Sequence, residues 1–186
     1  MQQTVERMDV LGVDIGGVII SKARGGADTS LFGENYLETN AVPGAFDALQ
    51  SLVERRFGDR IYLVSKCGPR VEVKTHRCLE HHRFYECTGV QLNHVRFCRE
   101  RHEKVHLCEE LGIKYFVDDR LDFLMNLRTL PPWYELPLVS DQQVAARPSR
   151  FPARIRRVNG WDEALEELWG GGQRAASSPG NSRSGG

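Results

Sequence analysis

The sequence predicts an α/β fold, in which a parallel sheet carries helices on both faces in a three-layer Rossmann-like arrangement. The first observation is the run at residues 11–20, LGVDIGGVII, which is apolar except for Asp14 and three glycines. The second is the segment 113–119, IKYFVDD, another apolar stretch that ends in carboxylates. The third is the alternation of strand and helix patterns along the chain. Buried parallel strands are near-continuous apolar runs, and strands that alternate with helices favour parallel sheets.

The predicted strands are short apolar runs between turn residues. They begin with the run at 11–20 and continue at 60–65, 93–98, 114–118, 136–140 and, at a sheet edge, 155–158. The segment 21–40 contains several glycines and is predicted to be a loop with one short helical turn, lying beside Asp14. The segment 84–90 is ambiguous and is interpreted as a loop or a short strand.

The predicted helices show apolar residues at helical spacing and have identifiable ends. They cover residues 45–56, 69–82, 103–111, 121–130 and 161–169. Pro69 fits the first turn of the second helix, and Gly112 fits the position after the third. Two prolines at 131–132 stop the fourth helix, because proline lacks the amide hydrogen that a helix needs.

The chain of 186 residues has the size of one domain. Residues 1–169 are predicted to form this domain. Residues 170–186 are dominated by Gly, Ser, Ala, Arg and Pro, which bury too little apolar surface to fold. We therefore expect residues 170–186 to form a disordered tail.

Charge and cysteine content narrow the classes of function. The chain has 25 Lys and Arg against 25 Asp and Glu, so no excess of basic charge indicates binding to nucleic acid or to a membrane surface. The polar start lacks a signal-peptide core, and no apolar run is long enough to span a bilayer. Five cysteines without close pairs are typical of reduced thiols. These observations predict a soluble cytoplasmic protein.

Two predicted strands end in carboxylates, Asp14 in one case and Asp118 with Asp119 in the other. Ligands of open α/β sheets bind beyond the carboxyl ends of the strands, and carboxylates there suit a hard cation such as Mg²⁺. The alternative is that the acids only terminate strands in solvated turns, since Asp and Gly are ordinary turn residues. Local sequence leaves both interpretations open.

Four segments in order resemble the motifs of the haloacid dehalogenase-like (HAD) hydrolases. Residues 13–19 resemble the first motif, Asp-x-Asp-Gly-Thr/Val, and residues 61–65 resemble the second, an apolar strand that ends in Ser or Thr. Lys104 resembles the lysine of the third motif, and residues 116–119 resemble the fourth. Gly16 is the departure, because it stands where the first motif has its second Asp. The resemblance implies a HAD-like core with a minimal or absent cap domain.

The resemblance also implies roles for the carboxylates. Asp14 is expected to attack a phosphoryl group and form an aspartyl-phosphate. The other oxygen of Asp14, the backbone carbonyl of Gly16 and Asp118 or Asp119 are expected to hold Mg²⁺. Asp119 could instead orient Lys104. A backbone carbonyl does not depend on the side chain, so glycine at position 16 keeps the implied metal site.

Further residues are implied at the phosphate. Ser65 is expected to donate its hydroxyl to a phosphate oxygen, and Lys104 to neutralise the phosphate charge. Gly17 is a further candidate for substrate contact, and Lys66 and Arg70, just after Ser65, are weaker ones. The alternatives are a serine that only ends a strand and lysines that lie on solvated surfaces.

Cys98, His102 and His106 recur at four-residue intervals, with both histidines on one predicted helix face. Zinc sites need four ligands of definite geometry, and the sequence has neither a close cysteine pair nor a His-Glu-x-x-His pattern. These residues are therefore interpreted as surface histidines and a packed cysteine.

The glycine at position 16 leads to two functional hypotheses. The first is a Mg²⁺-dependent phosphatase that is weak or selective for good leaving groups, because a missing general acid costs about 10²–10⁴ in rate. The second is a non-catalytic module that binds phosphate or Mg²⁺ for regulation or assembly. With no room for a cap domain in 21–40 or between Ser65 and Lys104, we expect an open site. The expected substrate is a phosphorylated small molecule or macromolecule. The resemblance implies that a capless form acts on a macromolecule or borrows a wall from a second subunit of a homo-oligomer.

Overall fold

The structure, a computed structural model, describes residues 9–22, 31–120, 123–124, 133–135 and 155–174. Within them, six strands form one parallel sheet in the order β3-β2-β1-β4-β5-β6. The strands are β1 (Leu11–Val13), β2 (Ile61–Lys66), β3 (Val95–Cys98), β4 (Tyr115–Asp118), β5 (Trp133–Glu135) and β6 (Ile155–Arg157). The predicted parallel sheet is thus confirmed, with β1 at its centre between β2 and β4.

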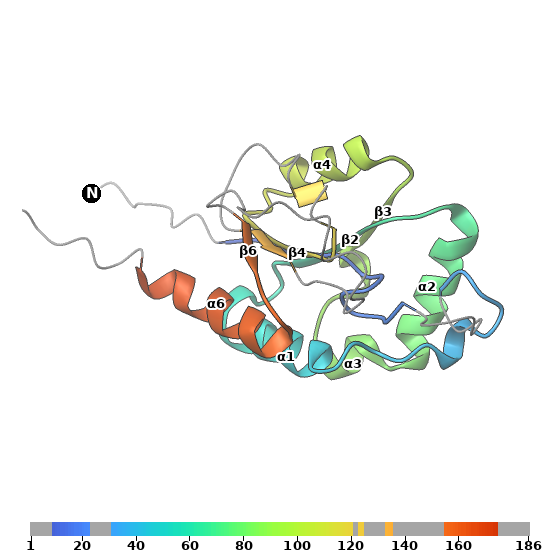
Figure 1. Cartoon of the computed structure of the whole chain (residues 1–186), viewed down its shortest axis with the longest axis horizontal. Helices are drawn as coiled ribbons and strands as arrows, with labels where there is room; N and C mark the ends of the chain where they lie inside the picture. The colour runs from blue at the N-terminus through green and yellow to red at the C-terminus, as the bar shows by residue number, and fades with distance from the viewer. Residues whose placement is uncertain (1–8, 23–30, 121–122, 125–132, 136–154, 175–186) are drawn as a thin grey trace, which may run out of the picture.

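Helices cover both faces of the sheet, which makes the predicted three-layer arrangement. Figure 1 shows α4 on one face and α1, α3 and α6 on the other. The helices are α1 (Ala45–Leu52), α2 (Pro69–His81), α3 (Phe84–Thr88), α4 (Arg101–Glu110) and α6 (Trp161–Arg174). Shorter turns are η1 (Tyr36–Glu38), the π-helical η2 (Val53–Phe57), which extends α1, and η3 (Leu92–His94). The short helical turn predicted within 21–40 corresponds to η1.

The central strand β1 is fully buried and packs closely against β4. Gly12 pairs with Phe116 in the sheet register. A β-carbon on Gly12 would lie 2.5 Å from the Phe116 ring, so glycine is required for this close approach. The small residue therefore lets the two strands that end in carboxylates lie side by side.

The turn after β1 is held by the core beneath it. Ile15, Val18, Ile19 and Ile20 are fully buried. Each such side chain contributes about 1.5–3 kcal/mol when removed from water. Trp161 at the start of α6 donates its indole N–H to the carbonyl oxygen of Val18 at 2.7 Å. The chain directly after Asp14 is therefore anchored by the last helix.

The interpretation of residues 84–90 as a loop or short strand was wrong, because α3 occupies 84–88. Phe84 and Thr88 lie one helical turn apart and are both buried, and the Phe84 ring packs edge-on against Phe46 of α1 at 5.1 Å. Gly89 follows with φ +76°, the left-handed conformation that ends helices. Packing against α1 thus stabilises a helix too short to be recognised from periodicity.

The C-terminal part differs from the prediction in two further places. The strand β5 lies at residues 133–135, which the sequence analysis did not assign to a strand, whereas the predicted strand at 136–140 lies outside the described residues. Of the predicted helix at 121–130, only residues 123–124 are described, and they are helical. The helix α6 continues to Arg174, so residues 170–174 of the predicted tail are helical, and residues 175–186 lie outside the described part.

All five cysteines are unbonded, in agreement with the prediction of free thiols. Across the described ranges, none of the helices has the length and apolar character that crossing a membrane requires.

Candidate active site

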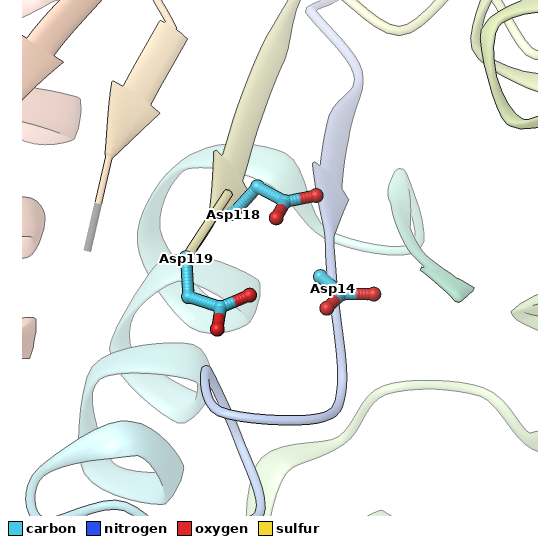
Figure 2. Close-up of side chains that lie close together, drawn as sticks. All are labelled: Asp14, Asp118 and Asp119. Atoms are coloured by element: carbon cyan, nitrogen blue, oxygen red, sulfur yellow. The ribbon is translucent and has the colours of Figure 1, made fainter. Parts of the chain in front are cut away.

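The three carboxylates predicted at strand ends meet in the structure. Because Val13 of β1 and Val117 of β4 are partners in the parallel register, the residues that follow them leave the sheet side by side. Asp14, Asp118 and Asp119 each offer a carboxylate oxygen, and these oxygens lie within 4.8 Å of one another. Figure 2 shows the three side chains gathered at the ends of these strands. All three residues are buried, with exposed fractions of 7%, 1% and 5%.

Lys104 reaches this cluster from α4 on one face of the sheet. Its ammonium donates to Asp14 Oδ1 at 3.0 Å and to Asp118 Oδ2 at 2.7 Å. The start of α4 is held by a reciprocal capping box between Glu100 and Glu103, next to Lys104 in the chain. Burial lowers the pKa of Lys104, but the two carboxylates raise it more, so the ammonium stays charged at neutral pH.

A second lysine at the cluster was missed by the sequence analysis. Lys22 lies after the turn that follows Asp14, and its ammonium pairs with Asp119 Oδ2. No motif marked Lys22, because it belongs to the segment interpreted as a loop. The signal that could have found it is its position a few residues beyond Asp14, where a basic side chain can return to the strand end.

The electrostatics of the cluster favour an additional cation. Burial raises the pKa of both Asp118 and Asp119, and the neighbouring carboxylate of Asp14 raises them further, against the opposing effects of Lys104 and Lys22. The ammonium groups of Lys104 and Lys22 pair with these carboxylates, and Lys66, Arg101 and Arg120 also line the cavity. Asp118 Oδ1 accepts the backbone N–H of Arg120 at 2.8 Å, whereas Asp119 Oδ1 is buried without a hydrogen-bond partner among the described residues.

This donor set fits Mg²⁺, which takes carboxylate and carbonyl oxygens as ligands. A buried carboxylate oxygen without a partner is costly, and a cation held by Asp14, Asp118 and Asp119 would satisfy it. Gly16, whose backbone carbonyl is the further predicted ligand, lines the same cavity.

The two glycines of the turn differ in the space around them. A β-carbon on Gly16 would meet no atom within 4 Å, so the backbone leaves open space where the resemblance expects an acid. Gly17 has φ +90°, and a β-carbon there would lie 2.8 Å from Asp119 Oδ2. The site therefore needs glycine at position 17 but not at position 16.

The carboxylates lie in a cavity of about 320 Å³. Ser65 and Lys66, at the end of β2, line it together with Gly16, Lys22 and Lys104. Arg70 is not among the lining residues. The structure thus brings Asp14, Gly16, Asp118 and Asp119 together with Ser65, Lys66 and Lys104, whereas Gly17, like Arg70, does not line the cavity and lies against Asp119 instead.

The residues weighed as a zinc site lie elsewhere. Cys98 is buried on β3 and donates its thiol to the carbonyl oxygen of Ser65. His102 and His106 stack edge-on along α4, with ring centres 6.4 Å apart. In the described part of the chain, the three aspartates form the one cluster of three or more potential metal ligands within reach of a single ion.

The core elements account for the whole interval between Ser65 and Lys104. These residues form α2, α3, η3, β3 and the start of α4, so no cap domain is inserted there. In the described part of the interval between Asp14 and α1, the one helix is the three-residue η1.

No family model and no curated protein matches the sequence. Solved structures do match the fold. A haloacid dehalogenase-like family hydrolase from Xanthomonas campestris aligns over 91% of this chain and 98% of its own, with 8% identity and a TM-score of 0.61. A D,D-heptose 1,7-bisphosphate phosphatase from Burkholderia thailandensis aligns over 87% and 98%, with 16% identity and a TM-score of 0.59. A haloacid dehalogenase-like hydrolase from Burkholderia xenovorans aligns over 86% and 96%, with 12% identity and a TM-score of 0.56. At these identities the likeness shows the fold.

Proposed function

We propose that this chain, which has the haloacid dehalogenase-like fold, is a Mg²⁺-dependent phosphatase that works through an aspartyl-phosphate on Asp14. The observation that carries the proposal is that Asp14, Asp118 and Asp119 lie together in one cavity, where Lys104 bonds to Asp14 and Asp118. Buried carboxylates in this number are costly to the fold, and their gathering in a cavity suits a catalytic site.

The proposed reaction has two steps. A carboxylate oxygen of Asp14 attacks phosphorus, and the bond between phosphorus and the ester oxygen breaks, with its electron pair going to the leaving group. Water then attacks the aspartyl-phosphate, which releases inorganic phosphate and restores Asp14. Lys104 and the hydroxyl of Ser65 offset the negative charge of the phosphoryl group from the cavity wall. Mg²⁺, when held by Asp14, Asp118 and Asp119, supplies further positive charge against the phosphate.

Gly16 limits which substrates are hydrolysed quickly. No carboxylic acid is offered at this position to protonate the leaving oxygen, and such an acid contributes about 10²–10⁴ in rate. The loss falls on alkyl esters, whose leaving oxygen is strongly basic. Phosphates with less basic leaving groups lose little, so the enzyme is selective for them.

The test measures phosphate release by the purified protein with Mg²⁺, from p-nitrophenyl phosphate, acetyl phosphate and a metabolite panel. The control is Asp14→Asn, which keeps the size of the side chain but removes the nucleophile. We expect release by the wild type alone. Equal release by both proteins from every substrate would overturn the proposal.

The second candidate is a non-catalytic module that binds phosphate or Mg²⁺. It is favoured by Gly16, because the open space beside Asp14 lacks the acid that the resemblance expects. The phosphoryl mimic BeF₃⁻ separates the candidates. A nucleophilic Asp14 should bind BeF₃⁻ with Mg²⁺, detected by isothermal titration calorimetry and lost in Asp14→Asn, whereas a binding module should take up phosphate without this dependence.

A further inference from the structure

The cavity has an apolar side that the reaction above does not use. Leu31, Phe32 and Val71 line it together with the charged groups and are here called the apolar wall. Leu31 is buried and belongs to the hydrophobic core, whereas Phe32 is 73% exposed. A large exposed aromatic side chain that lines a cavity is a candidate ligand contact, because aromatic residues bury large areas on binding.

The apolar wall is attached to α2 by named contacts. The ammonium of Lys74 donates to the carbonyl oxygen of Gly33 at 2.6 Å and lies 3.7 Å from the carboxylate of Glu34. Lys74 and Val71 both belong to α2, which begins directly after the strand that carries Ser65. The segment that bears Leu31 and Phe32 is thus fixed to the helix that bears Val71. The apolar wall and the carboxylates line the same cavity.

We propose that the preferred substrate is an aryl phosphate, the phosphate ester of a phenol. This inference rests on the phosphatase activity proposed above. Two separate features of the cavity favour this class of substrate. The open space at Gly16 favours a leaving oxygen that departs without a proton, and a phenol, with a pKa of about 10, is far more acidic than an alkyl alcohol. The apolar wall favours a ring attached to that oxygen.

Hydrolysis of an aryl phosphate by this route needs no reactant other than water. Asp14 forms a bond to phosphorus, the bond between phosphorus and the aryl oxygen breaks, and its electron pair leaves on the phenolate. Solvent protonates the phenolate outside the cavity, and water hydrolyses the aspartyl-phosphate. A cavity of about 320 Å³ has the small-ligand size that a phosphate and one ring need. Acetyl phosphate shares the good leaving group but has no ring for the wall to bind.

Three small substrates separate the effect of the leaving group from the effect of the ring. Phenyl phosphate has a ring and a good leaving group, benzyl phosphate has a ring and an alkyl leaving group, and acetyl phosphate has a good leaving group without a ring. We expect a lower KM for phenyl and benzyl phosphate than for acetyl phosphate. We expect kcat for benzyl phosphate to be about 10²-fold below that for phenyl phosphate, because the general acid is missing.

Variants assign the KM effect to the wall. Phe32→Ala should raise KM for phenyl and benzyl phosphate about three- to tenfold, and so lower the preference for aryl over acetyl phosphate. Val73→Ala is the matched control, because Val73 is an exposed apolar residue of α2 that does not line the cavity. Val73→Ala should leave the preference for aryl over acetyl phosphate unchanged. Circular dichroism of both variants confirms that they fold.

The outcomes distinguish this inference from the proposed function. Turnover of acetyl phosphate with no KM advantage for the aromatic esters, or an unchanged preference in Phe32→Ala, overturns the aryl assignment and leaves the phosphatase standing. No turnover of any of the three overturns the phosphatase itself. A phosphotyrosine peptide measured beside phenyl phosphate shows the source of the phenol: faster turnover of the peptide indicates a tyrosine side chain, and slower turnover indicates a small phenol.

Discussion

Gly17 lies directly against the carboxylate of Asp119, so that a β-carbon at position 17 would stand 2.8 Å from Asp119 Oδ2. The backbone of Gly17 also has φ +90°, a conformation that residues with side chains rarely adopt. The turn after β1 and the acidic end of β4 are therefore fitted to each other. The neighbouring Gly16 is under neither constraint, and this contrast leads to two predictions.

Gly17→Ala should lower the free energy of unfolding by about 1–3 kcal/mol, because alanine is strained at this φ and crowds Asp119. It should also weaken Mg²⁺ binding. Urea denaturation and calorimetric titration of Mg²⁺ measure the two effects. Gly16→Ala is the control and should stay within about 1 kcal/mol of wild type in stability. Equal losses in the two variants would contradict this view of the turn.

Gly16→Asp should raise kcat for alkyl phosphates by about 10²-fold, because it places an acid in open space beside the nucleophile. Phenyl phosphate should gain much less, since its leaving group departs without a proton. Steady-state kinetics with benzyl and phenyl phosphate measure the difference. Gly16→Asn matches the size without the acid and should show no gain. A gain in both variants would mean that proton donation is not the cause.

Lys104→Met should destabilise the protein by about 3–5 kcal/mol without Mg²⁺, because Asp14 and Asp118 lose their buried counter-charge. Saturating Mg²⁺ should restore part of this loss by replacing the positive charge. Urea denaturation with and without Mg²⁺ tests both statements. Lys114→Met is the control: Lys114 pairs with Asp9 at 3.0 Å but is partly exposed, so it should cost at most about 1 kcal/mol.

The titration of Asp118 should contribute to the pH dependence of the free energy of unfolding. Burial and neighbouring carboxylates raise its pKa in the folded state above the ordinary 3.8, so the folded protein holds this proton more tightly than the unfolded chain. The contribution of Asp118 to stability is therefore largest below pH 3.8 and declines as pH rises through the folded-state pKa. Urea denaturation across this range, in a chelator, should show a smaller decline in Asp118→Asn. A steeper decline in the variant would refute the sign.

Lys22→Met should strengthen Mg²⁺ binding about two- to fivefold, because it removes a positive charge that pairs with Asp119. The effect is modest because the Lys22 side chain is 37% exposed and partly screened by solvent. Lys66→Met provides the comparison, since Lys66 lines the same cavity from the end of β2. Calorimetry should find a smaller change there. Weaker binding in Lys22→Met would show that Lys22 supports the metal site.

The amino-acid sequence by itself determined the parallel α/β fold and the strand ends that carry Asp14, Asp118 and Asp119. These features are encoded locally, because apolar runs mark buried parallel strands and the register then places their carboxyl ends at one edge. The one-turn helix α3 was not recognisable locally, because its stability comes from the packing of Phe84 against Phe46. The length and hydrophobic periodicity of this segment do not predict that contact.

Only the tertiary structure decided the finer properties of the site. The pairing of Lys22 with Asp119 joins residues 97 positions apart, and the place of Lys22 shortly after Asp14 does not specify Asp119 as its partner. A solvated helix face was the alternative for Lys104 in the sequence, and the packing of α4 buries it between two carboxylates. Gly16 and Gly17 are identical as sequence letters, yet one faces open space and the other an aspartate. Such differences arise from distances between segments remote in the chain, which local patterns do not specify.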